Sequence, residues 1–119
     1  MAFNFREFTV TDPFGRDCQV RFVWLQTAIS IRHADAVDVK FTIHDGDYRN
    51  EKVIALPHPA LSEIAKRDGH ALNDAWVSRL AALHCKWMIE TGEDMEKPLD
   101  TMTRADLDRA NSSAIAAAA

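Results

Sequence analysis

The stretch that decides the fold runs from Asn73 to Gly92 and reads NDAWVSRLAALHCKWMIETG. Successive residues of an α-helix are turned by about 100°, so the largest apolar side chains of this stretch share one face. They are Trp76, Leu80, Leu83 and Trp87, with Val77, Ala81, His84 and Met88 beside them. The opposite face is mostly polar, with Ser78, Arg79, Lys86 and Glu90, and only Ala82 and Ile89 interrupt it. The pattern predicts a long amphipathic helix that covers an apolar surface.

Both ends of this helix carry recognisable signals. Asn73 is suited to cap the free amides of the first turn, and Asp74 adds negative charge near the positive end of the helix dipole. Gly92 can adopt the left-handed conformation that ends a helix. The helix boundaries are therefore expected at Asn73 and Gly92.

The first half of the chain alternates between apolar and polar residues, which is the pattern of half-buried strands. Short polar turns separate the segments, notably at Asp12–Gly15 and around Gly46. Strands are expected within residues 3–10, 17–25, 29–33, 37–44 and 51–56. The sequence therefore predicts an α+β fold. An N-terminal antiparallel meander of about five strands would have one face covered by a short helix after Pro57 and by the long C-terminal amphipathic helix.

The composition changes near the C-terminus. Residues 1–89 hold equal numbers of acidic and basic side chains, whereas residues 90–109 hold seven acids and three bases. We expect residues 1–98 to form a single α+β domain. Residues 99–119 read as an acidic, alanine-rich tail, with a short helix capped by Thr103 and a frayed end.

Several classes of function are disfavoured by what the sequence contains. The net charge is −4 and no basic cluster is interleaved with aromatic residues, so no nucleic-acid partner is expected. No apolar run reaches the length of a membrane span, and the N-terminus does not resemble a secretory signal. Cys18 and Cys85 are expected as free thiols. Together these features predict a cytoplasmic protein without a membrane partner. The four glycines are not spaced as in a phosphate-binding loop, so no nucleotide site of that kind is expected.

His84 is the most informative candidate site residue, because it lies on the apolar face of the long helix. A buried imidazole needs a hydrogen-bond partner, and a backbone carbonyl or a core carboxylate is the ordinary solution. A sharper hypothesis makes His84 the polar group of a ligand-binding pocket walled by Trp24, Trp76 and Trp87. No catalytic residue is expected in the leading interpretation. The alternative uses His84 as an acid or base, or His58, which two prolines hold where the sheet meets the helices.

A second set of polar residues lies in or beside the central strands. His33 and Asp35 with a distant His44 resemble the ligands of a site with two histidines and one carboxylate, which would hold a divalent metal as the cofactor. The simpler interpretation is that His33 and Asp35 end a strand and that His44 begins a solvated hairpin. The leading expectation is therefore no metal and no cofactor.

These patterns favour a small, non-enzymatic binding or accessory module that acts through protein contacts. The broad apolar face of the long helix predicts self-association as a homodimer, and the acidic tail suits another, basic protein as partner. The alternative is a small enzyme or ligand-binding protein with a His/Asp site in a pocket between the sheet and the helices.

Overall fold

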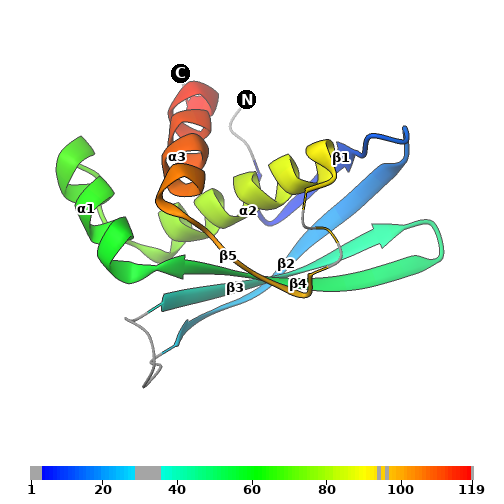
Figure 1. The fold of residues 1–119 in the computed structure, drawn as a ribbon, viewed down its shortest axis with the longest axis horizontal. Coiled ribbons are helices and arrows are strands. Elements are labelled where there is room, and N and C mark those ends of the chain that lie inside the picture. The colour runs from blue at the N-terminus through cyan, green and yellow to red at the C-terminus, as the bar shows by residue number, and fades with distance from the viewer. Residues whose placement is uncertain (1–3, 29–35, 94, 96, 119) are drawn as a thin grey trace.

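Helices cover one face of a five-stranded sheet in this protein (Figure 1). The computed structural model describes residues 4–28, 36–93, 95 and 97–118. In chain order the elements are β1 (Glu7–Thr11), β2 (Asp17–Ala28), β3 (Ala36–Asp45), β4 (Tyr48–Pro57), α1 (His58–Asp68), α2 (Asp74–Thr91), β5 (Leu99–Thr101) and α3 (Arg104–Ala118). The predicted α+β class is confirmed. We call the face of the sheet under the helices the inner face and the opposite one the outer face.

Strands β1 to β4 form the expected antiparallel meander, and local turn chemistry sets its hairpins. The Asp12 carboxylate accepts hydrogen bonds from the amides of Phe14 and Arg16, both at 2.9 Å, and this closes the β1–β2 turn. Gly46 has a φ of 60°, which lets strands β3 and β4 join through only two residues.

One strand of the described sheet, β5, comes from the C-terminal segment, where none was expected. The strand predicted at residues 29–33 lies outside the described residues. Strand β5 lies parallel to β4, with Leu99 beside Val53. Because β5 has only three residues and follows Pro98, no alternating pattern announces it.

The C-terminal segment also differs from the expected short helix with a frayed end. Helix α3 is 15 residues long and packs against α2 and α1. Leu107 is fully buried, and Ala110 and Ala114 are buried one and two turns later. Small side chains at this spacing allow α3 to approach its neighbours closely, so an alanine-rich stretch that looked too poor in apolar residues is ordered by packing within the chain.

Helix α2 begins and ends as predicted. The Asn73 side chain accepts a hydrogen bond from the Trp76 amide at 2.9 Å, and Gly92 ends the helix with a φ of 74°. The prediction of one apolar and one polar face is not confirmed, however. Ser78, Ala82 and Ile89, all expected on the polar face, are buried.

The sheet packs on a different side of α2 from the one expected. Ser78 lines a groove with Phe22 of β2, and Ile89 lines a cavity with Ile43 of β3, so the side with the smaller residues faces the sheet. The side with Leu83 and Trp87 faces α3 instead. Helix α2 is thus buried between two layers, which is why burial extends over both predicted faces.

Candidate functional site

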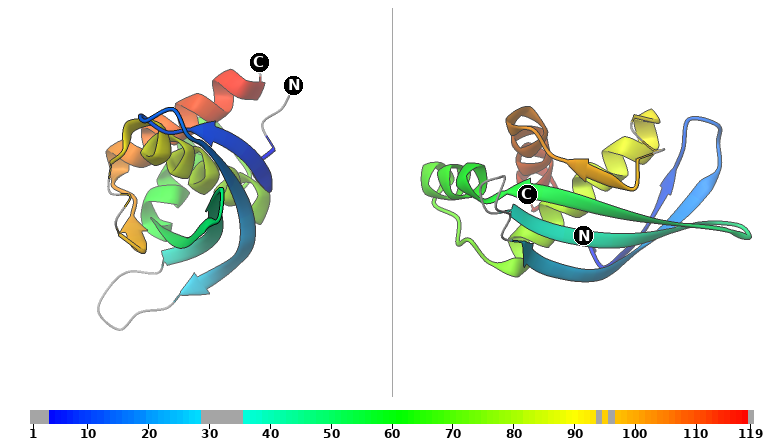
Figure 2. Two further views of the ribbon diagram at one scale, coloured as in Figure 1. Left: turned by 90° about the vertical axis from the view of Figure 1, so that its right-hand side faces the viewer. Right: turned by 60° about the horizontal axis from the view of Figure 1, so that its bottom comes forward.

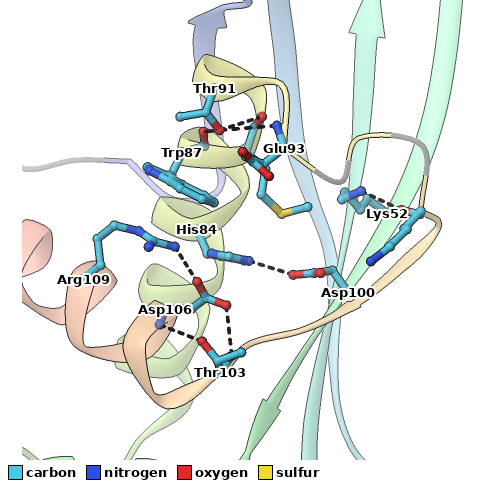
Figure 3. A network of polar contacts seen from close by, with 11 residues as sticks. Lys52, His84, Trp87, Thr91, Glu93, Asp100, Thr103, Asp106 and Arg109 are labelled. Carbon is cyan, nitrogen blue, oxygen red and sulfur yellow. Dashed lines mark hydrogen bonds and ion pairs between the residues drawn. The ribbon is translucent and has the colours of Figure 1, made fainter.

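The imidazole of His84 forms the centre of a buried polar cluster between α2, β5 and α3 (Figure 3). Its Nε2 atom lies 2.7 Å from Oδ2 of Asp100, whose side chain points from β5 toward α2. An ionised carboxylate can only accept, so Nε2 acts as the donor toward an ionised Asp100. Nδ1 of His84 is buried and has no hydrogen-bond partner in the part of the chain that the structure describes.

Aromatic stacking and a second ion pair extend this cluster. The rings of His84 and Trp87 are stacked with centroids 5.8 Å apart, and the Arg109 guanidinium lies 3.6 Å from the centroid of Trp87. Arg109 also donates to Asp106 at 2.6 Å. Burial by itself would raise the pKa of Asp106, but the Thr103 amide, Arg109 and the nearby imidazole together hold it below its ordinary value. His84 therefore lies between two carboxylates, those of Asp100 and Asp106 (Figure 3).

The chemistry of this cluster favours a structural role. A histidine that a carboxylate orients can act as a general acid or base. For this role, its other imidazole nitrogen must reach a substrate. The imidazole of His84 is only 3% exposed. The adjacent Cys85 does not supply a nucleophile, because burial raises the pKa of its thiol to about 12 and keeps it protonated. A cavity of about 130 Å³ lies between α2 and α3, and His84 itself lines it together with Trp87 and Arg109.

Sequence reasoning did not identify two polar residues of this region, Asp100 and Lys52. Asp100 is 16 positions from His84 and becomes its partner only because β5 joins the sheet. Lys52 is fully buried on the inner face, and its Nζ donates to the carbonyl of Lys97 at 2.6 Å. Lys52 shares the strand phase of Ile54 and Leu56, and this shared phase was a signal that it points into the core.

The structure does not bring Trp24 to His84. A register shift between Phe22 and Trp24 reverses which residues of β2 face the helices. Phe22 pairs with Phe41 on the inner face, whereas Trp24 pairs with Lys40 on the outer face, and the Lys40 ammonium lies 5.9 Å from the indole centroid. The expected alternation failed here because the bulge adds one residue to the strand.

Trp76 is also separate from the polar cluster. Its ring stacks on His70 with centroids 5.5 Å apart, at the start of α2. Of the three tryptophans expected to wall a pocket around His84, only Trp87 contacts it.

The other histidine candidates are far from one another. His58 is the first residue of α1 and lines a small cavity with Thr27 and Asp74. His44 points to the outer face of β3, opposite Arg49, so the sheet separates it from His84. His33 and Asp35 lie outside the described residues. Within the described ranges, no group of three or more potential ligands is positioned to hold a metal ion.

A different feature, which sequence reasoning missed, is the edge of β2. Strand β1 pairs with β2 only as far as Arg21, and the Phe22 amide donates to the Arg6 carbonyl at 2.9 Å. Residues 23–28 have β3 on one side and, in the described part of the chain, no strand on the other. In Figure 2 this end of β2 extends past β1 and borders the sheet. We call residues 23–28 the free edge.

The direction of the backbone groups on the free edge follows from the β3–β4 turn. A two-residue hairpin turn is closed by a hydrogen-bonded pair, here Asp45 and Tyr48, so alternate residues of β3 direct their amides toward β4. The remaining ones, including Asp38, bond to β2, where Asp38 faces Gln26. The amides and carbonyls of Leu25 and Thr27 consequently point away from β3, and in the described part of the chain no strand pairs with them there.

A groove runs along the free edge on the inner side. It encloses about 430 Å³ and lies between β2 and the first turns of α2, lined by Phe5, Arg6, Phe22, Leu25, Asp74, Ala75 and Ser78. The smaller cavity of about 140 Å³ that contains His58 adjoins it through Leu25 and Asp74. We call the larger cavity the edge groove. Backbone groups that no other described strand pairs with therefore lie beside an apolar recess.

Comparisons with known proteins supply no function for either region. The chain matches no protein family, no characterised protein and no solved structure. In the part of the chain that the structure describes, helices long and apolar enough to cross a membrane do not occur.

Proposed function

We propose that this protein is a non-enzymatic protein-binding module that takes an extended segment of a partner as an added strand at the free edge of β2. The observation that carries the proposal is the outward direction of the Leu25 and Thr27 backbone groups beside the edge groove. In strand addition, backbone hydrogen bonds supply affinity, and recesses for alternate side chains supply specificity.

The sequence of the free edge supports this use. Proteins protect exposed edges with charged residues or proline, because an unprotected edge pairs readily with other chains. Residues 23–28 read VWLQTA and contain neither. A bulge can also protect an edge, but here it lies before Trp24, and pairing with β3 is regular from Trp24 to Ala28.

The edge groove defines the chemistry of the partner. Phe5, Phe22 and Leu25 present apolar surface, and the charged residues among its described lining are Arg6 and Asp74. An incoming strand would direct every second side chain into this recess. The preferred partner segment is therefore uncharged, with apolar residues at alternate positions.

The contacts inside the chain weaken the two routes to a partner that the sequence suggested. The Trp87 side of α2 packs against α3, so a second molecule is not needed to cover it. Several acids of the C-terminal segment already meet bases of this chain, as Asp108 does with Arg67 at 3.2 Å. The free edge, which no other strand covers within the described residues, supports the proposed route.

A selection from a random peptide library tests the proposal. We expect the protein to select segments with alternating apolar residues, and Thr27→Pro to abolish their binding. Proline removes the outward amide without breaking a bond to β3, so an edge position tolerates it. Thr27→Val is the matched control, because it keeps the amide and the branched shape. Selected peptides that bind Thr27→Pro as tightly as the control variant would refute strand addition at this edge.

A further inference from the structure

We infer that the extended partner is a second copy of this chain, paired through the two free edges about a two-fold axis at Gln26. This inference rests on the proposed strand-binding edge and names its occupant. The two sheets would join, β2 against β2, into one antiparallel sheet with the helices of both copies on the same face.

The geometry of β2 suits such a pair. In an antiparallel pair of identical strands, a two-fold axis makes every contact occur twice. The regular part of the free edge runs from Trp24 to Ala28, and Gln26 is its midpoint. Centring on Gln26 places Leu25 opposite Thr27 of the other copy, and these are the two residues whose backbone groups point outward. Both therefore find hydrogen-bond partners in both copies.

The inward side chains of the free edge also meet those of the second copy on the helix side of the sheet. Leu25 pairs with Val39, which is fully buried, so Leu25 and Thr27 face the helix side of the sheet. In the paired sheet, Leu25 of each copy lies beside Thr27 of the other copy, at the smaller cavity that Thr27 lines with Val37 and Leu72. A half-buried leucine at the border of one chain thus gains apolar cover from the second chain.

Charge favours a second copy over a charged partner. Residues 23–28 carry no charge, so two free edges meet without repulsion. The described lining of the groove contains one base, Arg6, and one acid, Asp74. Their charges cancel, so the groove does not repel a second copy of the chain. Strands with several charges would have to bury them against apolar groove walls at a large desolvation cost.

Light scattering over a hundredfold range of protein concentration gives the first test. We expect the mass of two chains for the full-length protein and for the control Thr27→Val. Thr27→Pro should raise the dissociation constant at least tenfold, because it deletes one outward amide in each copy. Circular dichroism of the variant establishes that it is folded.

Cysteine cross-linking gives a second test that does not depend on proline being tolerated. Gln26→Cys places two thiols opposite each other at the axis, so oxidation with copper phenanthroline should link the copies by a disulfide. Gln19→Cys is the matched control, because Gln19 lies on the same strand but beside Thr9 of β1. Both native cysteines are buried, which keeps the background low.

The outcomes separate this inference from the proposed function. Single-chain mass at every concentration would overturn the second copy as partner, whereas peptide binding that depends on the Thr27 amide would still support the strand-binding edge. A dimer that Thr27→Pro leaves intact and that Gln26→Cys does not link would also overturn the inference, because the copies would then meet elsewhere.

Discussion

The Nε2 atom of His84 and the Oδ2 atom of Asp100 lie 2.7 Å apart and join the middle of α2 to strand β5. Together with the stack of Trp87 on His84, this bond ties the C-terminal segment to the rest of the molecule. The cluster therefore stabilises the packing of α2 between the sheet and α3.

His84→Ala should lower the free energy of unfolding by about 1–3 kcal/mol, because the Asp100 carboxylate then loses its buried partner. Urea unfolding followed by circular dichroism measures the change. Asp108→Asn is the control, because it weakens an ion pair whose side chains are about half exposed, and such pairs contribute about 0–1 kcal/mol. If the two substitutions lowered the free energy of unfolding equally, the hydrogen bond of His84 would not be a major source of stability.

Trp87→Ala should lower stability by roughly 2 kcal/mol, since it removes a stacked ring and the cation–π contact of Arg109. It should leave the oligomeric mass unchanged, because this side of α2 faces α3 rather than a second chain. Unfolding and light scattering on the same sample measure both quantities. A shift from dimer to monomer would instead support an interface through the tryptophan stripe of α2.

Asp68 should make stability depend on pH in the acid range. Hydrogen bonds from Arg67 and Asn111 lower the pKa of Asp68 from 3.8 to about 2. A carboxyl whose folded pKa is lowered contributes its full stabilisation above the ordinary pKa and loses it as the pH falls toward the folded one. Unfolding free energies should therefore fall between about pH 4 and pH 2, and less steeply in Asp68→Asn. Asp47→Asn, in the β3–β4 turn, serves as the control, and equal slopes in both variants would contradict the assignment.

Cys85 should not react with iodoacetamide in the folded protein at neutral pH. Its side chain is fully buried, and this burial raises the pKa of the thiol to about 12. Mass spectrometry after digestion should find Cys85 alkylated only when the reaction is run in denaturant. Rapid alkylation under native conditions would mean that α2 separates from the sheet readily.

Local signals predicted those parts of the fold that depend on neighbouring residues. The cap at Asn73, the end of α2 at Gly92 and the turn at Gly46 all follow from interactions within a few positions. The alternation of Val37, Val39 and Phe41 likewise identified the inner side of β3. Each of these features has a stereochemical cause that the sequence displays directly.

Long-range pairing explains what the sequence did not predict. One extra residue between Phe22 and Trp24 turned Trp24 away from His84, and hydrophobic alternation does not record such a bulge. Strand β5 is too short for a period-two pattern, so the partnership of His84 with Asp100 could not be anticipated.

The sequence by itself determined the α+β class, the hairpin turns and both ends of the long helix, because turns, caps and periodicity act over a few residues. Only the tertiary structure decided which side of α2 meets the sheet and which segment completes the sheet. It also decided that β2 continues past β1, so that among the described residues no strand pairs with Leu25 and Thr27 on that side. Burial of α2 between two layers depends on α3, and the free edge depends on the relative lengths of β1 and β2. Neither the burial of α2 nor the free edge can be predicted from the residues that are near it in the sequence.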